Sequence, residues 1–278
     1  MNTPKKIRMY LGIPSTGDRS DGQCYLLREL QERYSDRIEF VYPDLCAFRI
    51  FHDYARNEVV EEFLESGCDV LWFLDSDVVP PKHTLDLITM HWDKWLVAGA
   101  PYPVFMNPPG WETQQVVFTV YKGTDGKGLY PSKIPYSGTE FVDGMATGCI
   151  FIKREVFKKL SKPYFEFKFD KESRHMDEGE DLGFCMKLQK LGIKFFTDYS
   201  MACKHYKHVD LLDVNNYAID QSSRAIKEYD TNIKKQVEAA VKEAYKRGLD
   251  KGREQAAARG APHTTKSGLI LPSSLANV

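Results

Sequence analysis

Asp75 and Asp77 are the residues whose type and spacing most plainly suggest chemistry in this chain. They follow the apolar run DVLWFL at residues 69–74, with Ser76 between them and two prolines shortly after. Side chains two residues apart on a strand share one face, so the two carboxylates would repel each other at short range. A positively charged group is therefore expected between them.

A divalent cation is the group that this acidic pair suits best. The sequence contains neither a P-loop nor a dinucleotide-binding glycine motif. A bound nucleotide would need its phosphate charge neutralised in another way, and a cation held by Asp75 and Asp77 would do so. Aspartate is also common wherever a strand ends in a turn, so the pair alone does not establish a site.

The elements that would position this pair alternate between strand and helix. Strands are expected at residues 7–14, 37–43, 69–74 and 95–102, a strand and a helix within 146–160, and a last strand within 193–206; helices are expected at 24–34, 56–67, 84–92 and 178–192. This alternation predicts an α/β fold, with a mostly parallel sheet flanked by helices and ligands at the carboxyl ends of the strands.

The rest of the chain departs from this rhythm. Residues 104–145 are rich in proline, glycine and aromatic residues, with a strand-like stretch at 114–122, and such long loops usually serve binding. We expect a catalytic domain over residues 1–220, a charged, alanine-rich helical extension over 221–260 that could self-associate, and a disordered tail over 261–278.

Composition narrows the class of protein but does not identify a partner. The chain has 278 residues, 42% of them hydrophobic, and a formal net charge of -1, which gives no footprint for non-specific nucleic-acid binding. Its six cysteines are scattered and several lie in apolar runs, which favours reduced core thiols and a cytoplasmic location. No apolar stretch approaches the length of a transmembrane helix.

Six motifs follow one another in order: YLGIP at 10–14, ARN at 55–57, LDSDVVPP at 74–81, GMATGCIFIKREVF at 144–157, EGEDLGFCMKLQKLG at 178–192 and a late histidine. This ordered set resembles the GT-A glycosyltransferases, especially the inverting family 2-like group. The resemblance spans about residues 6–210 and implies a hexosyltransferase that uses a nucleoside diphosphate sugar, such as a UDP- or GDP-sugar.

The resemblance implies roles for residues on the donor side of such a site. Asp75 and Ser76 would face the donor sugar or ribose, and Asp77 would bind the metal, with Asp75 as a further candidate ligand. His205, or failing that His208, would be the late metal ligand. The family holds its nucleotide where Pro14, Arg56 and Asn57 fall. Two carboxylates and an imidazole suit Mn²⁺ slightly better than Mg²⁺.

The resemblance also implies a catalytic base in the acidic pair Glu180 and Asp181, with Asp181 the better match. An acceptor hydroxyl that attacks with inversion needs a carboxylate base on the opposite face of the sugar. Both acids could instead be first-turn residues that complement a helix dipole. Arg56 could simply pair with an acid, Asn57 could cap its helix, and His205 could lie at the surface among lysines.

The acceptor is not identified and could be a glycan, a lipid-linked sugar, a protein or a modified base. Tyr102, Trp111 and Tyr136 are candidate stacking platforms for it, although they could be ordinary half-buried aromatics. Two other functions remain open. The chain could be a haloacid-dehalogenase-like phosphohydrolase with Asp75 as nucleophile, although two strand-helix units precede the motif. It could also be a non-catalytic nucleotide- or carbohydrate-binding module.

Overall fold

The computed structural model describes residues 6–14, 21–43, 51–106, 115–123, 129–131, 137–169, 172, 176–207 and 211–258. Trp111, Tyr136 and His208 lie outside these residues. The chain divides into two compact units, Met1–Asp213 and Val214–Val278, which are described separately below.

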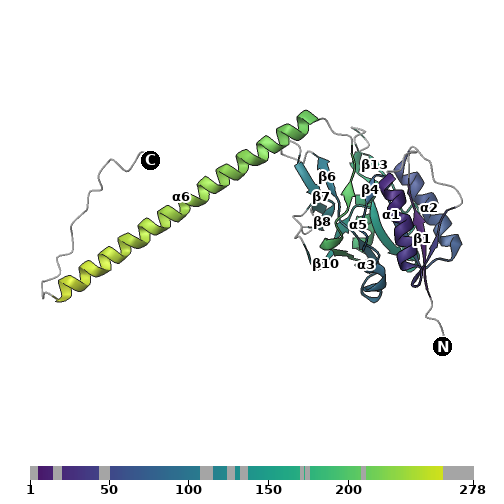
Figure 1. Cartoon of the computed structure of the whole chain (residues 1–278), viewed down its shortest axis with the longest axis horizontal. Helices are drawn as coiled ribbons and strands as arrows, with labels where there is room; N and C mark the ends of the chain where they lie inside the picture. The colour runs from purple at the N-terminus through teal and green to yellow at the C-terminus, as the bar shows by residue number, and fades with distance from the viewer. Residues whose placement is uncertain are drawn as a thin grey trace. The chain divides into compact units, whose positions relative to one another are not determined.

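A seven-stranded sheet forms the centre of the first unit (Figure 1). Its strand order is β10-β15-β5-β12-β3-β1-β2. The strands are β1 (Ile7–Gly12), β2 (Ile38–Val41), β3 (Val70–Leu74), β5 (Val97–Gly99), β10 (Thr139–Val142), β12 (Cys149–Lys153) and β15 (Phe195–Asp198). The strands β10 and β12 run opposite to the other five. The predicted α/β fold with a mostly parallel sheet is therefore confirmed.

Helices cover both faces of this sheet because the central strands are apolar on both sides. β3 is buried at every position, as expected of a strand in a sandwiched sheet. On one face, α1 (Asp21–Tyr34) and α3 (Asp86–Thr89) contribute to a cluster with Trp72 and Phe151. On the other face, α2 (His52–Ser66), α4 (Arg154–Phe157) and α5 (Glu180–Lys190) contribute to a cluster with Phe73 and Ile150.

Helix α2 ends as the sequence predicts, and Arg154 holds its last turn. Gly67 caps the helix in the left-handed conformation with φ 71°, which glycine adopts without steric cost. The Arg154 guanidinium donates hydrogen bonds of 2.6 to 2.7 Å to the carbonyl oxygens of Phe63, Leu64 and Cys68. A residue that follows β12 thus supplies donors to carbonyls that a helix end leaves without intrahelical partners.

Short strands outside the main sheet replace two predicted single strands. The stretch at 114–122 forms β7 (Gln115–Phe118), which pairs with β6 (Pro103–Met106), and β8 (Val120–Gly123), which pairs with β9 (Leu129–Pro131) and β11 (Gly144–Met145). The predicted last strand is interrupted by the 3-10 turn Tyr199–Met201, so that β16 (Lys204–His205) leaves the main sheet and pairs with β4 (Val78–Val79). A separate pair, β13 (Lys168–Phe169) and β14 (Met176–Glu178), precedes α5. The predicted helix at 84–92 is only α3 and the 3-10 helix Trp92–Lys94.

The C-terminal extension is one long helix, α6 (Leu211–Ala258), which begins earlier than the sequence suggested. Its apolar side chains Ile219, Ile226, Ile233, Val237 and Val241 are exposed. Spacings of seven and four residues bring these side chains onto one stripe of the helix. None of the described helices has the length and apolar content that a membrane crossing requires.

Candidate functional site

The site lies at the edge of the main sheet where several strands end or begin. The strand β1 has β2 on one side and β3 on the other, both parallel to it, so the chain passes from β1 to β2 and then crosses back past β1 to reach β3. Ligands bind beyond the carboxyl ends of strands at such a switch point. Because β12 runs antiparallel to β3, its start meets the end of β3, and Asp75 donates its amide N–H to the Gly148 carbonyl at 2.9 Å.

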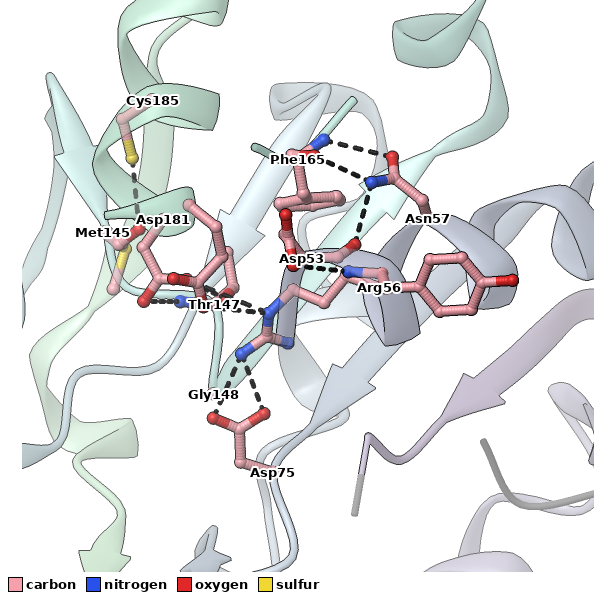
Figure 2. A network of polar contacts seen from close by, with 12 residues as sticks. Asp53, Arg56, Asn57, Asp75, Met145, Thr147, Gly148, Phe165, Asp181 and Cys185 are labelled. Carbon is pink, nitrogen blue, oxygen red and sulfur yellow. Dashed lines mark hydrogen bonds and ion pairs between the residues drawn. The ribbon is translucent and has the colours of Figure 1, made fainter. Parts of the chain in front are cut away.

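Arg56 is the buried centre of this edge. Its side chain is 2% exposed and reaches from α2 toward Asp75 and Asp181 (Figure 2), and Glu180 lies beside them. Its Nη2 donates to both carboxylate oxygens of Asp75, at 3.0 and 3.2 Å. Its Nε lies 3.6 Å from a carboxylate oxygen of Glu180 and 3.9 Å from one of Asp181. Asp75 of the "DSD" motif and both acids of the "ED" motif therefore share Arg56 as their cation. This agrees with the alternative that Arg56 pairs with an acid.

The charges of this cluster are unevenly compensated. Burial disfavours the charged form of Arg56, but the surrounding carboxylates outweigh burial and raise its pKa above the ordinary value. Burial raises the pKa of Asp75, Arg56 opposes this rise, and the charge of Asp181 adds to it. Among the described residues, Nε and Nη1 of Arg56 have no hydrogen-bond partner although both are buried. The cluster thus combines surplus negative charge with unused N–H donors.

The predicted catalytic pair lies in the first turn of α5, as expected. Asp181 accepts hydrogen bonds from the hydroxyl of Thr147 and, at 3.4 Å, from its backbone N–H. Burial raises the pKa of Glu180 to about 7, and the neighbouring charge of Asp181 contributes to this shift. The side chain of Glu180 is 13% exposed and that of Asp181 25% exposed. Two adjacent acids therefore differ in environment, as pairs that divide acid and base roles do.

Gly148 allows Tyr102 and Asp75 to approach each other. A Cβ at this position would lie 2.6 Å from the Tyr102 hydroxyl oxygen and 2.9 Å from Oδ2 of Asp75. The Gly148 N–H donates to the Tyr102 hydroxyl oxygen at 3.2 Å. Tyr102 is 5% exposed, so it is part of the packed wall of the site and not an open stacking platform in this conformation.

Asp77 faces different cationic partners from Asp75. The loop after β3 turns between them, and Oδ2 of Asp77 lies 3.4 Å from Nε2 of His205 and in contact with the Lys207 ammonium. Burial alone would raise the pKa of Asp77, but hydrogen bonds from His205 and Lys207 lower it to about 2. The expected positive charge is therefore divided, with Arg56 beside one carboxylate and basic side chains beside the other.

His205 is oriented by its second ring nitrogen. Nδ1 lies 2.7 Å from the Pro103 carbonyl oxygen, which can only accept, so Nδ1 carries the proton. Nε2 is therefore the nitrogen that faces Asp77. It donates to Asp77 when both ring nitrogens carry protons, and in the neutral ring it offers the lone pair with which a histidine binds a metal. The side chain is only 6% exposed. Within the part of the chain that the structure describes, no three His, Cys, Asp or Glu groups cluster closely enough to form a complete metal site.

Other predicted residues have varied surroundings. Pro14 is buried two residues after the end of β1, and Ser76 lies in the turn between the two aspartates. The Asn57 side chain accepts from the backbone N–H groups of Tyr164 and Phe165 and donates to the Phe165 carbonyl at 2.7 Å (Figure 2). Asn57 thus ties this segment to α2, and its predicted contact with a nucleotide stays a prediction.

Sequence reasoning missed Thr147, Gly148 and Lys207. The first two lie within the motif GMATGCIFIKREVF, where a small residue just before a strand could have signalled a close approach. Nothing in the sequence distinguishes Lys207 from the other lysines near His205. Its contact with Asp77 joins positions 130 residues apart, which no local pattern reveals.

Comparisons with known proteins give only distant similarities. No family model matches the chain, and no curated protein matches it. Among solved structures, the A197 protein from STIV is 20% identical over 73% of this chain and 87% of that chain, with a TM-score of 0.46. GalNAc-T7 with UDP, GalNAc and Mn²⁺ is 10% identical over 73% of this chain and 44% of that chain, with a TM-score of 0.42. The catalytic domain of Drosophila beta1,4-galactosyltransferase 7 with xylobiose is 14% identical over 73% and 71%, with a TM-score of 0.38.

These similarities carry no functional argument, because every TM-score is below 0.5 and every identity is low. The chain also spans less than half of the GalNAc-T7 chain.

Proposed function

We propose that this protein is a metal-dependent glycosyltransferase that moves a sugar from a nucleoside diphosphate sugar, such as a UDP- or GDP-sugar, to an acceptor hydroxyl with inversion. One observation carries the proposal. Asp75, Asp77, Glu180, Asp181 and His205 come from three distant parts of the sequence and gather at the strand edge where α/β folds bind ligands. This is the set of residue types that such a transfer needs.

Asp77 and His205 fit a divalent cation. Their facing atoms, Oδ2 and Nε2, are 3.4 Å apart, and one oxygen with one imidazole nitrogen suits Mn²⁺ or Mg²⁺, with the nitrogen favouring Mn²⁺. Asp75 is the further candidate ligand. When bound, the metal would stabilise the negative charge that develops on the departing diphosphate.

The residues around Arg56 fit the donor and the acceptor. Buried N–H donors of Arg56 without a partner among the described residues favour an additional acceptor at this edge. Asp75, fixed by Arg56, would orient the donor sugar, with Pro14 and Ser76 beside it. Asp181, fixed by Thr147, would take the proton from the acceptor hydroxyl, and Glu180 would orient the attacking group.

The contacts of Asp75 argue against the phosphohydrolase alternative. Both carboxylate oxygens of Asp75 accept hydrogen bonds from Arg56, which reduces the nucleophilicity that a covalent phosphoaspartate mechanism requires. Trapping of a phosphoaspartate at Asp75 would contradict this conclusion.

The buried cysteines bear on the compartment of the protein. Cys68, Cys149, Cys185 and Cys203 are free and buried, which favours a reducing, cytoplasmic compartment.

We propose that α6 associates with α6 of a second copy through its stripe of exposed apolar side chains. Acidic and basic residues are interspersed along α6, with ion pairs such as Arg224 with Asp220 at 2.8 Å, so no long block of like charge opposes pairing.

The test is a thermal-shift panel of nucleoside diphosphates and their sugars, with and without MnCl₂, on the wild type and Asp77→Ala. We expect one nucleotide to raise the melting temperature of the wild type only when Mn²⁺ is present. Asp77→Ala should keep the melting temperature of the ligand-free protein within a few degrees and lose the Mn²⁺-dependent increment. Tight nucleotide binding without metal, or an unchanged increment in the variant, would contradict the proposal.

A further inference from the structure

Two groups compete for one oxygen of Asp77. The Lys207 ammonium and Nε2 of His205 both face Oδ2, His205 at 3.4 Å. A metal ion bound to Asp77 and His205 would need that oxygen at about 2.0–2.2 Å. The ammonium in contact with the same oxygen would then lie too close to a doubly charged ion.

The backbone just before Lys207 is held, while the side chain of Lys207 is largely exposed. β16 pairs with β4, with His205 opposite Val78, and the Tyr206 N–H donates to the Asp77 carbonyl at 2.9 Å. The Lys207 side chain is 56% exposed, in contrast to the 6% of His205. A lysine side chain is flexible and strongly hydrated, so its ammonium can leave the carboxylate without disturbing the strand pair.

His205 and Lys207 therefore differ in how firmly they are held beside Asp77. The imidazole is fixed by the Pro103 carbonyl at 2.7 Å and keeps Nε2 directed at Asp77. The ammonium neutralises the carboxylate from the solvent side. A cation that enters between Oδ2 and Nε2 gains both atoms and must displace only the exposed lysine.

We propose that Lys207 is a tethered cation that holds Asp77 in the metal-free protein and is displaced when a divalent ion binds. This inference rests on the proposed metal position at Asp77 and His205. Lys207 lowers the affinity of the nucleotide-free protein for Mn²⁺, because each binding event must first break the Lys207–Asp77 ion pair.

The experiment is titration of the full-length, nucleotide-free protein with MnCl₂, followed by calorimetry and by the loss of the free Mn²⁺ electron paramagnetic resonance signal. Lys207→Met keeps the length of the side chain and removes its charge. Since an exposed ion pair is worth up to about 1 kcal/mol, we expect this variant to bind Mn²⁺ roughly three- to fivefold more tightly than the wild type. The matched control is Lys204→Met, an exposed lysine of β16, which should bind like the wild type.

A second readout follows the lysine itself. Acetylation by a low concentration of acetic anhydride, mapped by mass spectrometry, should modify Lys207 faster when Mn²⁺ is present, while modification of Lys204 stays constant. Equal or weaker Mn²⁺ affinity of Lys207→Met, or a Lys207 acetylation rate that ignores Mn²⁺, overturns the inference. If Asp77→Ala still loses Mn²⁺ binding in that case, the proposed function stands. If Asp77→Ala binds Mn²⁺ like the wild type, both fail.

Discussion

Asp181 and Glu180 are adjacent in the sequence, yet their surroundings suit them to different tasks. Asp181 is held by the hydroxyl and N–H of Thr147, whereas burial raises the pKa of Glu180 to about 7. Asp181→Asn keeps the shape and removes the basicity. We expect it to retain donor and Mn²⁺ affinity while kcat falls by roughly a hundred- to ten-thousandfold, as is typical of a lost general base.

Glu180→Gln is the matched comparison and should lower kcat less. Titration calorimetry with donor, together with transfer kinetics on both variants and the wild type, separates binding from chemistry. Near-normal turnover of Asp181→Asn, or a loss of donor binding that equals its loss of rate, would assign the base to another residue.

The raised pKa of Glu180 also predicts a pH dependence of stability. Because the folded pKa of about 7 exceeds the ordinary value of 4.5, folding favours the protonated acid. The contribution to stability is complete below about pH 4.5 and is lost as the pH rises through about 7. Urea unfolding at several pH values between these limits should therefore show a steeper decline for the wild type than for Glu180→Gln. Parallel declines would mean that Glu180 titrates normally.

Among the elements, α2 depends for its C-terminal turn on the side chain of Arg154, which follows β12. Arg154→Met removes the hydrogen bonds to the carbonyls of Phe63, Leu64 and Cys68. We expect a loss of about 1–3 kcal/mol in the free energy of unfolding, measured in urea, because these carbonyls lose charged donors. Lys158→Met, an exposed change just after α4, is the control. Equal free energies of unfolding for the two variants would show that hydrogen bonds from water replace those from Arg154 without loss of stability.

The helices and central strands could be predicted because their apolar periodicity is strong and local. The run from Val70 to Leu74 and the cap at Gly67 are examples. The short strand pairs could not, since β4 and β16 have two residues each and depend on partners far along the chain. Neighbours on a helix also point about 100° apart, so the motif ARN could not tell that Arg56 enters the core while Asn57 holds residues 164–165.

The whole molecule combines a unit that contains the described site residues with one that consists largely of α6. Truncation after Asp220 should leave a folded domain that keeps its donor affinity, because the sheet and the residues around Arg56 lie within Met1–Asp213. Circular dichroism and calorimetry with the donor check the fold and the affinity. Light scattering should show that the truncation is monomeric while the full chain assembles. A truncation that is insoluble or does not bind the donor would instead mean that residues 1–220 need the rest of α6 to fold or to bind.

Arg56 is a single guanidinium among three carboxylates, and this imbalance has a consequence for engineering. Like charges held together in a partly dehydrated place oppose folding until a ligand compensates them. Neutral substitutions at Glu180 or Asp181 relieve this repulsion. A directed-evolution screen that rewards heat resistance alone would therefore enrich amides at these positions, and the most heat-resistant variants would lack the proposed catalytic acids.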